Sequence, residues 1–488
     1  MKKIICILVF IMISAQLISC EKVQETKEYG SPSNRINYGV SKIPNDLSSY
    51  DDTVTRTLMG ALFEGLIYKS SDGKIVPQLS DSYSVDKNQL EYTFKIRRDI
   101  YWSNGEKITS TDFVNFFKEY VDNCKSLDDL KELSAVYGIK EYFTNKKDFN
   151  KTVAIMADGE YLKIRLNFKD DNFISALALP KYKLRKDFTK LKNYRNSFKD
   201  LIYSGSYKIS DVKEDIITLE KNKYYYNKDN GVNTINLVIQ NNSEYALASF
   251  ETNKIDIMEE PPINYLQKLR ERQEVIEYPY NDVKFIAYNC QEKSTFSDAK
   301  LREDFYEYIQ GLISDDKFSE RISGTQVLSF SDNSEKEGKS LRSEPKSSLM
   351  ELKSVTIYAE DNDTNKEFLK YVTEEAKKDN LIIYYKLFPM DDLIEELKKG
   401  NYSMYIDDFD EDSGMTNKFT EEALKSSKGN GDLSKSQVLE NSKKDFVRVP
   451  MFRKNKVIVK KSYIQEIEED FYGDVILNSL KLMNNTSV

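Results

Sequence analysis

Five carboxylates lie within six residues of the chain: Asp407, Asp408, Asp410, Glu411 and Asp412. The alternate spacing of Asp408, Asp410 and Asp412 is that of the first ligands in a calcium-binding loop. Such a loop also needs a glycine and a closing bidentate carboxylate, and this chain has Ser413 and Phe419 at those positions. The acidic run is therefore not predicted to hold calcium. From the residues alone, it is interpreted as a solvated acidic loop.

The chain of 488 residues contains no histidine. This excludes Ser-His-Asp and Cys-His nucleophiles, an imidazole general base, and zinc, nickel or haem held by histidine. The net charge of −8, without a strongly basic stretch, argues against nucleic acid as a partner. Cys124 and Cys290 have no metal-ligand spacing and are expected to be isolated thiols. We therefore expect a binding protein with no catalytic residue, no cofactor and no metal.

The amino terminus indicates export. Lys2 and Lys3 precede an apolar run from Ile4 to Ile18, which is too short for a spanning helix and reads as a cleaved secretory signal over residues 1–19. The ending Leu17-Ile18-Ser19-Cys20 resembles a bacterial lipobox, which implies a diacylglyceryl thioether on Cys20 and cleavage before it. An ordinary signal peptide whose cleavage site falls near a cysteine is the alternative. The polar residues 20–34 predict a flexible tether.

Strand and helix patterns alternate in two separate regions. The first has a strand at 235–239, a helix at 243–252 and a strand at 255–258. The second has strands and helices in turn at 354–359, 366–378, 381–388, 391–399 and 402–406. Such repeats imply parallel sheets with helices on their faces. Two sheets of this kind in a secreted chain favour two lobes joined by a hinge, with a ligand cleft between them.

Nearer the amino terminus, alternating apolar residues from Leu90 to Ile96 predict a half-buried strand. Thr109 can cap a following helix, and Asp112 has the spacing to complete a capping box. The helix would place an aromatic face, which includes Phe113 and Phe117, toward a core. We expect these rings to be structural.

Several segments in this region match a known pattern in order and spacing. They are Phe63-Glu64-Gly65-Leu66-Ile67, Asp72-Gly73, Tyr92-Thr93-Phe94-x-Ile96-Arg97, Trp102-Ser103-Asn104-Gly105, Ser204-Gly205-Ser206-Tyr207 and Phe296-Ser297-Asp298. Together they resemble the family 5 extracellular solute-binding proteins, which are the peptide, dipeptide and nickel receptors of ABC importers. The resemblance is nearest to the oligopeptide branch. It covers about residues 35–322 well and residues 353–412 more loosely.

The resemblance implies an α/β, two-lobed, periplasmic-binding-protein-like (type II) fold with an extra inserted domain, a hinge and an interlobe cleft. Domain I would comprise residues 35–54, 163–268 and 453–488, and domain II residues 55–162. Domain III, the second lobe, would span 269–452 and would be shortened, with linkers near 329–348 and 425–444. Trp102 would belong to a structural turn of domain II.

The resemblance also implies how a ligand is held. A peptide would lie extended between the lobes, paired like an added strand, with its side chains in hydrated pockets. Its buried ammonium group would need a carboxylate. Phe409 and Asp412 fall on the family's aromatic and ammonium-binding positions, with Asp408 and Asp410 as second choices. The other ligand-binding residues implied are Lys42, Ile43, Tyr288 and Asn289.

These observations predict a monomeric, lipid-anchored extracellular protein that captures oligopeptides for an ABC importer. Its partners would be short peptides, the importer's permease subunits and, through the lipid, the membrane. One alternative is a receptor for a signalling peptide or another non-nutrient ligand. Another is a surface adhesin that keeps the fold without a working cleft.

Overall fold

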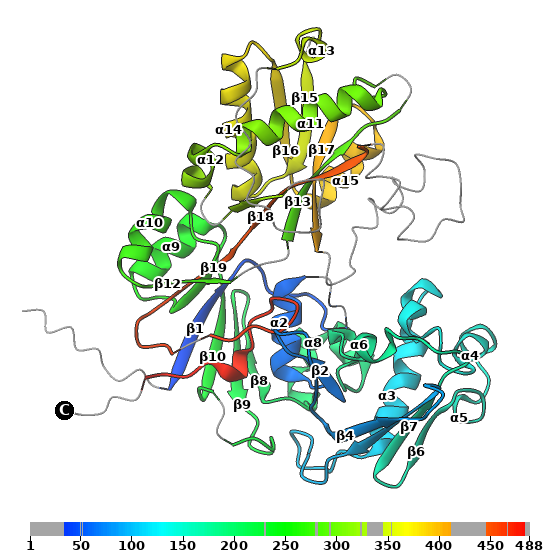
Figure 1. Cartoon of the computed structure of the whole chain (residues 1–488). Coiled ribbons are helices and arrows are strands. Elements are labelled where there is room, and N and C mark those ends of the chain that lie inside the picture. Colours follow the sequence, from blue (N-terminus) through cyan, green and yellow to red (C-terminus); the bar gives the residue numbers. More distant parts are fainter. Residues whose placement is uncertain are drawn as a thin grey trace, which may run out of the picture.

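The computed structural model describes residues 34–483 except 49, 51, 229–230, 279–281, 292–293, 323–324, 329–344, 353, 411–445 and 466. The predicted signal and nearly all of the tether, with Cys20, lie outside the described residues, as does the predicted linker near 425–444. Most of the buried hydrophobic residues fall into two large clusters, one in each of two lobes (Figure 1). The described chain is an α/β protein with several sheets.

The first lobe is built on a seven-stranded sheet with the order β12-β19-β11-β1-β10-β9-β8. Its central strand β1 is parallel to β10 on one side and to β11 on the other. Helix α9 connects β10 to β11, as the strand-helix-strand pattern predicts. The strands are β1 (Arg35–Val40), β8 (Tyr207–Val212), β9 (Ile216–Lys221), β10 (Thr234–Ile239), β11 (Ile257–Glu259), β12 (Val275–Tyr278) and β19 (Lys456–Lys460), and the helices α9 (Ser243–Glu251) and α10 (Ile263–Glu271).

A four-stranded antiparallel sheet with the order β4-β5-β7-β6 forms the inserted region of the first lobe. Helix α3 packs against this sheet and begins with the predicted cap, since the Thr109 N–H donates to Asp112 Oδ2 at 2.8 Å. Phe113 and Phe117 are buried, as expected. Trp102 is fully buried in the preceding turn. The elements are β2 (Ile67–Lys69), β3 (Ile75–Pro77), β4 (Ser80–Val85), β5 (Glu91–Ile96), α3 (Ser110–Asn123), β6 (Ile155–Asp158) and β7 (Tyr161–Arg165).

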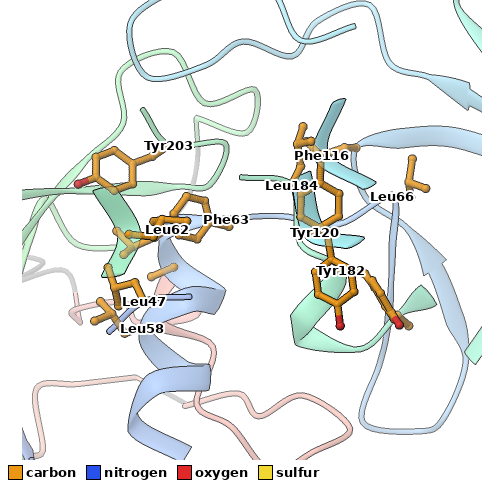
Figure 2. Close-up of a cluster of buried hydrophobic side chains, with 14 of the residues drawn as sticks. Leu47, Leu58, Leu62, Phe63, Leu66, Phe116, Tyr120, Tyr182, Leu184 and Tyr203 are labelled. Carbon is orange, nitrogen blue, oxygen red and sulfur yellow. The ribbon is translucent and has the colours of Figure 1, made fainter. Parts of the chain in front are cut away.

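One continuous core joins the seven-stranded and four-stranded sheets. At its centre is α2 (Thr53–Leu62), where Leu58, Leu62 and Phe63 lie beside Tyr203 (Figure 2). The Phe63 and Tyr203 rings are 5.8 Å apart between centroids. The remaining short helices of this lobe are η1 (Asp128–Leu133), α4 (Ile139–Asn145), α5 (Phe149–Thr152), α6 (Phe173–Leu177), η2 (Pro180–Tyr182), α7 (Phe188–Lys192), α8 (Tyr194–Ser197), η3 (Phe198–Asp200) and η4 (Leu477–Ser479).

The second lobe is built on a six-stranded sheet with the order β14-β18-β13-β17-β15-β16. Strand β15 is parallel to β16 and to β17, and helix α14 turns the predicted side chains of Phe368, Tyr371 and Val372 into the core. The elements are β13 (Asp282–Tyr288), α11 (Ala299–Ile313), α12 (Asp316–Arg321), β14 (Thr325–Val327), α13 (Ser347–Met350), β15 (Val355–Glu360), α14 (Asp363–Lys378), β16 (Ile383–Phe388), α15 (Met390–Lys398), β17 (Met404–Asp410) and β18 (Arg448–Lys454).

The chain passes between the lobes at two places. One lies between β12 and β13, and the other is Asn455 alone, between β18 and β19. Two glutamates of the first lobe flank the second crossing. Glu260 Oε1 accepts from the Val457 N–H at 3.0 Å and Glu260 Oε2 pairs with Lys454, while Asn455 donates to Glu277 Oε2 at 3.5 Å. Two adjacent extended crossings form a hinge.

The sheets place two domain boundaries differently from the sequence-based expectation. Residues from 269 onward were expected in the second lobe, but β12 pairs with β19 in the first-lobe sheet, so the crossing comes after Tyr278. Strand β18 belongs to the second-lobe sheet to its end at Lys454, beyond the expected limit of 452. The periodicity of these short strands does not reveal which sheet they join.

Cys124 and Cys290 are free thiols. None of the helices in the described part of the chain is both long and apolar enough to cross a membrane.

The segment Ser204-Gly205-Ser206 holds the carboxyl end of α2. The Gly205 N–H donates to the Leu62 carbonyl at 2.9 Å, and the Ser204 hydroxyl accepts from the Glu64 N–H at 3.1 Å. These contacts satisfy backbone groups that a helix end leaves unpaired. A Cβ at Gly205 would lie 2.5 Å from the Ala61 carbonyl oxygen, which is backbone and cannot rotate away. Only glycine fits this close approach.

We therefore expect Gly205→Ala to lower the free energy of unfolding of the first lobe by about 1–3 kcal/mol, through overpacking. Urea titration followed by the fluorescence of Trp102, the single tryptophan, reports on this lobe. Ser206→Ala in the same segment removes only a 3.4 Å hydrogen bond and should lower it by less than about 1 kcal/mol. Equal losses in the two variants would contradict the steric explanation.

Candidate ligand-binding site

The carboxyl ends of the parallel strands in each lobe are the expected place for a ligand. In the first lobe, residues 41–52 follow β1, and Gln240–Asn242 follow β10. In the second lobe, Asp361 and Asn362 follow β15. These segments belong to the edges from which α9 and α14 begin.

The two edges meet in a direct contact between the lobes. The Ser243 hydroxyl donates to Asp363 Oδ2 at 2.6 Å. Both residues open a helix, and each helix is capped by an asparagine: Asn242 accepts from Tyr245 N–H at 2.7 Å, and Asn362 accepts from Asn365 N–H at 2.9 Å. Because helix amino termini carry partial positive charge, the Asp363 carboxylate between them is favourably placed. The strand ends of both lobes therefore face one another.

The two predicted residues after β1 lie in different environments. Lys42 is exposed, and its Nζ lies 3.2 Å from Asp52 Oδ2. Ile43 is 6% exposed and packs in the first-lobe core. Its apolar side chain contributes to the core, and contact of Ile43 with ligand stays a prediction.

Tyr288 and Asn289 also have structural roles. Tyr288 is 5% exposed in the second-lobe core, with its ring 5.0 Å from that of Phe296. Asn289 donates to the carbonyls of Gly400 and Tyr402 at 3.2 and 3.0 Å, and its Oδ1 accepts from the Gln291 N–H at 3.1 Å. The Asn289 side-chain amide thus links the end of β13 to the turn before β17. That Tyr288 and Asn289 contact ligand stays a prediction, and in this structure both side chains are used within the second lobe.

The first part of the acidic run is strand rather than loop. Strand β17 extends to Asp410 and pairs with β13 in a register that sets Asp408 opposite Lys284, Phe409 opposite Val283 and Asp410 opposite Asp282. Asp282 is the first residue of the strand that follows the crossing between the lobes. The end of β17 therefore lies at the interlobe edge of the second-lobe sheet. Asp412 lies outside the described residues.

Asp407 has a separate, structural role within the run. Its Oδ2 accepts from Arg448 Nε at 2.7 Å, and the two side chains are only 4% and 2% exposed. The Arg448 guanidinium lies 3.6 Å from the centre of the Phe285 ring, on the strand between them. Sequence reasoning missed Arg448, because nothing local links it to a carboxylate 41 positions earlier. Within the described residues, no group of three potential metal-ligating side chains is present.

Comparison with solved structures shows which known fold this chain shares. A periplasmic oligopeptide-binding protein from Borrelia burgdorferi superposes with a TM-score of 0.68 at 18% identity, over 92% of this chain and 100% of that one. OppA from Listeria monocytogenes, bound to peptide, gives a TM-score of 0.66 at 16% identity, over 93% and 100%. The fold is thus that of the two-lobed solute-binding proteins.

The sequence of the chain was also compared with a family model and with individual relatives. Residues 74–304 match the model described as bacterial extracellular solute-binding proteins, family 5. The chain is 27% identical to the oligopeptide-binding protein OppA of Bacillus subtilis over 42% of its own length and 39% of that protein's. It is 26% identical to the periplasmic murein peptide-binding protein MppA of Escherichia coli over 49% and 46%. These alignments span less than half of each relative. Over residues 74–304, the chain is therefore similar to family 5 of the bacterial extracellular solute-binding proteins.

We expect Asp407→Asn to destabilise the second lobe by about 3–5 kcal/mol, because the Arg448 charge would stay buried without its partner. Urea unfolding followed by far-ultraviolet circular dichroism should show this loss, while the transition of Trp102 in the first lobe should move little. Asp361→Asn, at an exposed position of the same lobe, should change stability by less than about 0.5 kcal/mol. A shift of the Trp102 transition as large as that of the dichroism would contradict a role confined to the second lobe.

Proposed function

We propose that this protein is the extracellular substrate-binding component of an ABC importer and that it captures oligopeptides. The similarity to the family supports binding of a solute, and the names of the similar proteins point to peptides. The observation that carries the proposal is the contact of Ser243 with Asp363 across the lobes, beside a hinge of two crossings. A ligand that touches both strand-end edges stabilises the closed arrangement, because only differential contact can shift such an equilibrium.

The peptide's ammonium group is assigned to a carboxylate just beyond β17. The register of Asp410 with Asp282 supports this, since it brings the end of β17 to the interlobe edge and Asp412 follows two residues later. A buried ammonium group needs a compensating charge. Asp407 is excluded from this role, because its carboxylate already accepts from Arg448 inside the sheet.

Asp412→Asn keeps the size of the side chain but removes its charge, so peptide binding should weaken by about 2–5 kcal/mol. Isothermal titration calorimetry with a mixed set of tri- to pentapeptides measures this loss. Amino-acetylated forms of the same peptides should bind the unaltered protein about as weakly as free peptides bind the variant.

Asp408→Asn and Asp410→Asn are the matched comparisons, because they are the second choices for the same role. One of the three variants should carry most of the loss. The ammonium assignment would be overturned if all three variants bound free peptide normally and acetylated peptides bound equally well.

We further propose that Cys20 carries the lipid that holds the protein at the outer face of the cell membrane. The Leu-Ile-Ser-Cys ending of the apolar leader supports this. Acyl chains supply the membrane affinity that the polar residues after Cys20 lack.

Cys20→Ser should therefore move the protein from the membrane fraction to the medium or the soluble fraction, or leave its leader uncleaved. Quantitative immunoblotting of fractions, with mass measurement of the amino-terminal peptide, distinguishes these results. Cys124→Ser is the control and should leave the distribution unchanged. Undiminished membrane attachment of a cleaved Cys20→Ser protein would contradict the lipid anchor.

A further inference from the structure

The first lobe contains a polar cavity of about 470 Å³ that lies away from the contact between the lobes. It is enclosed by α2, by the hairpin of β2 and β3, and by the carboxyl-terminal segment 468–481. Tyr68, Tyr225 and Tyr226 contribute aromatic walls. Among the predicted ligand-binding residues that the structure describes, none lines this cavity.

One face of α2 and its extension presents polar groups to the cavity. Arg56 and Gly60 lie one turn apart on α2, and Glu64, two residues beyond the end of the helix, lines the same cavity. Arg56 is paired through Nε and Nη2 with the two oxygens of Asp474 at 2.7 and 3.0 Å. This buried pair ties the carboxyl-terminal segment to α2 and closes one end of the cavity. Asp470 Oδ1 accepts from the Tyr472 and Asp474 N–H groups.

Inside the cavity, one acidic group and one basic group each have a polar atom that makes no hydrogen bond with a described residue. Glu64 is 2% exposed, its Oε1 accepts from Tyr225, and the Tyr226 hydroxyl also stabilises its carboxylate. Its Oε2 is buried and makes no hydrogen bond of good geometry among the described residues. Lys183 Nζ makes no ion pair or hydrogen bond with any described side chain, although it interacts electrostatically with Asp470 and Glu64. It reaches over Gly60, where an added Cβ would lie 3.2 Å from Nζ.

Burial dominates the electrostatics of the two charged groups in this cavity. Burial raises the pKa of the Glu64 carboxyl to about 7 and lowers the pKa of the Lys183 ammonium. Buried polar atoms are nearly always paired, and an unmatched one is costly. The Lys183 ammonium is a donor and Glu64 Oε2 is an acceptor. Both line the cavity, and they do not bond to each other. A molecule that carries both an anionic and a cationic group would satisfy both.

We propose that this cavity is a second binding site, separate from the interlobe site, and that it takes a free α-amino acid. The ligand's carboxylate pairs with Lys183, and its ammonium group donates to Glu64 Oε2. The cavity is large enough for any amino-acid side chain beside the tyrosine walls, with water filling the remainder.

The test is calorimetric titration of the full secreted chain with individual L-amino acids, for example leucine, phenylalanine, lysine and glutamate, to about 10 mM, which detects millimolar affinity. Amino-acid amides and N-acetyl amino acids are the matched ligands, since each lacks one of the two charges. They probe the site without any change to the protein. Each should bind about 10- to 100-fold more weakly than its parent amino acid, the range for one charged hydrogen bond.

Lys183→Met and Glu64→Gln should weaken amino-acid binding to a similar extent. Lys190→Met is the control, because Lys190 is a surface residue paired only locally with Asp187, and it should bind normally. Circular dichroism establishes that each variant is folded. Saturating oligopeptide should not compete with the amino acid.

Three results would overturn the proposal. They are the absence of binding by every amino acid tested, equal binding of the amides and acetylated forms, and full competition by oligopeptide, which would place the amino acid between the lobes. If oligopeptide does not bind the protein at all, the competition experiment decides nothing, and the first two results alone test the second site. The test of the second site therefore does not depend on whether the proposed function is correct.

Discussion

The two chain crossings between the lobes are the constraint on which the rest of the structure depends. Strand β18 ends at Lys454 and β19 begins at Lys456, so a single residue, Asn455, separates strands of two different sheets. So short a connection fixes the distance between the lobes while leaving their relative angle free to change. Glu260 and Glu277 hold the first-lobe side of this crossing. Motion of the lobes is thus restricted to rotation about a narrow axis, and it brings the same two strand-end edges together.

Patterns within a short stretch of sequence predicted most of the fold. The capping residues Thr109 and Asp112, and the inward face of α14, depend only on local spacing, and the structure contains both. Periodicity could not reveal sheet membership. Strand β12 has the same local pattern in either lobe, and its place beside β19 depends on residues about 180 positions away.

The site was harder to predict than the fold, because a motif identifies a position without telling which way a side chain points. Tyr288 and Asn289 lie near the edge of a strand but turn inward, the tyrosine into the core and the asparagine to the carbonyls before β17. The acidic run presents another difficulty, since five neighbouring carboxylates look alike in the sequence. The Asp407 carboxylate accepts a hydrogen bond from Arg448, which comes close to it only after β18 has joined the sheet.

The stretch Arg448–Lys460 enters both sheets at inner positions: β18 between β14 and β13, and β19 between β12 and β11. Each lobe therefore lacks an interior strand until almost the whole chain has emerged. Because a chain is synthesised from its amino terminus, neither lobe can complete its sheet before the other. Domains usually form in the order of their synthesis, but here the two lobes finish together. Until that moment, both sheets expose unpaired strand edges, and such edges make an incomplete chain prone to aggregation.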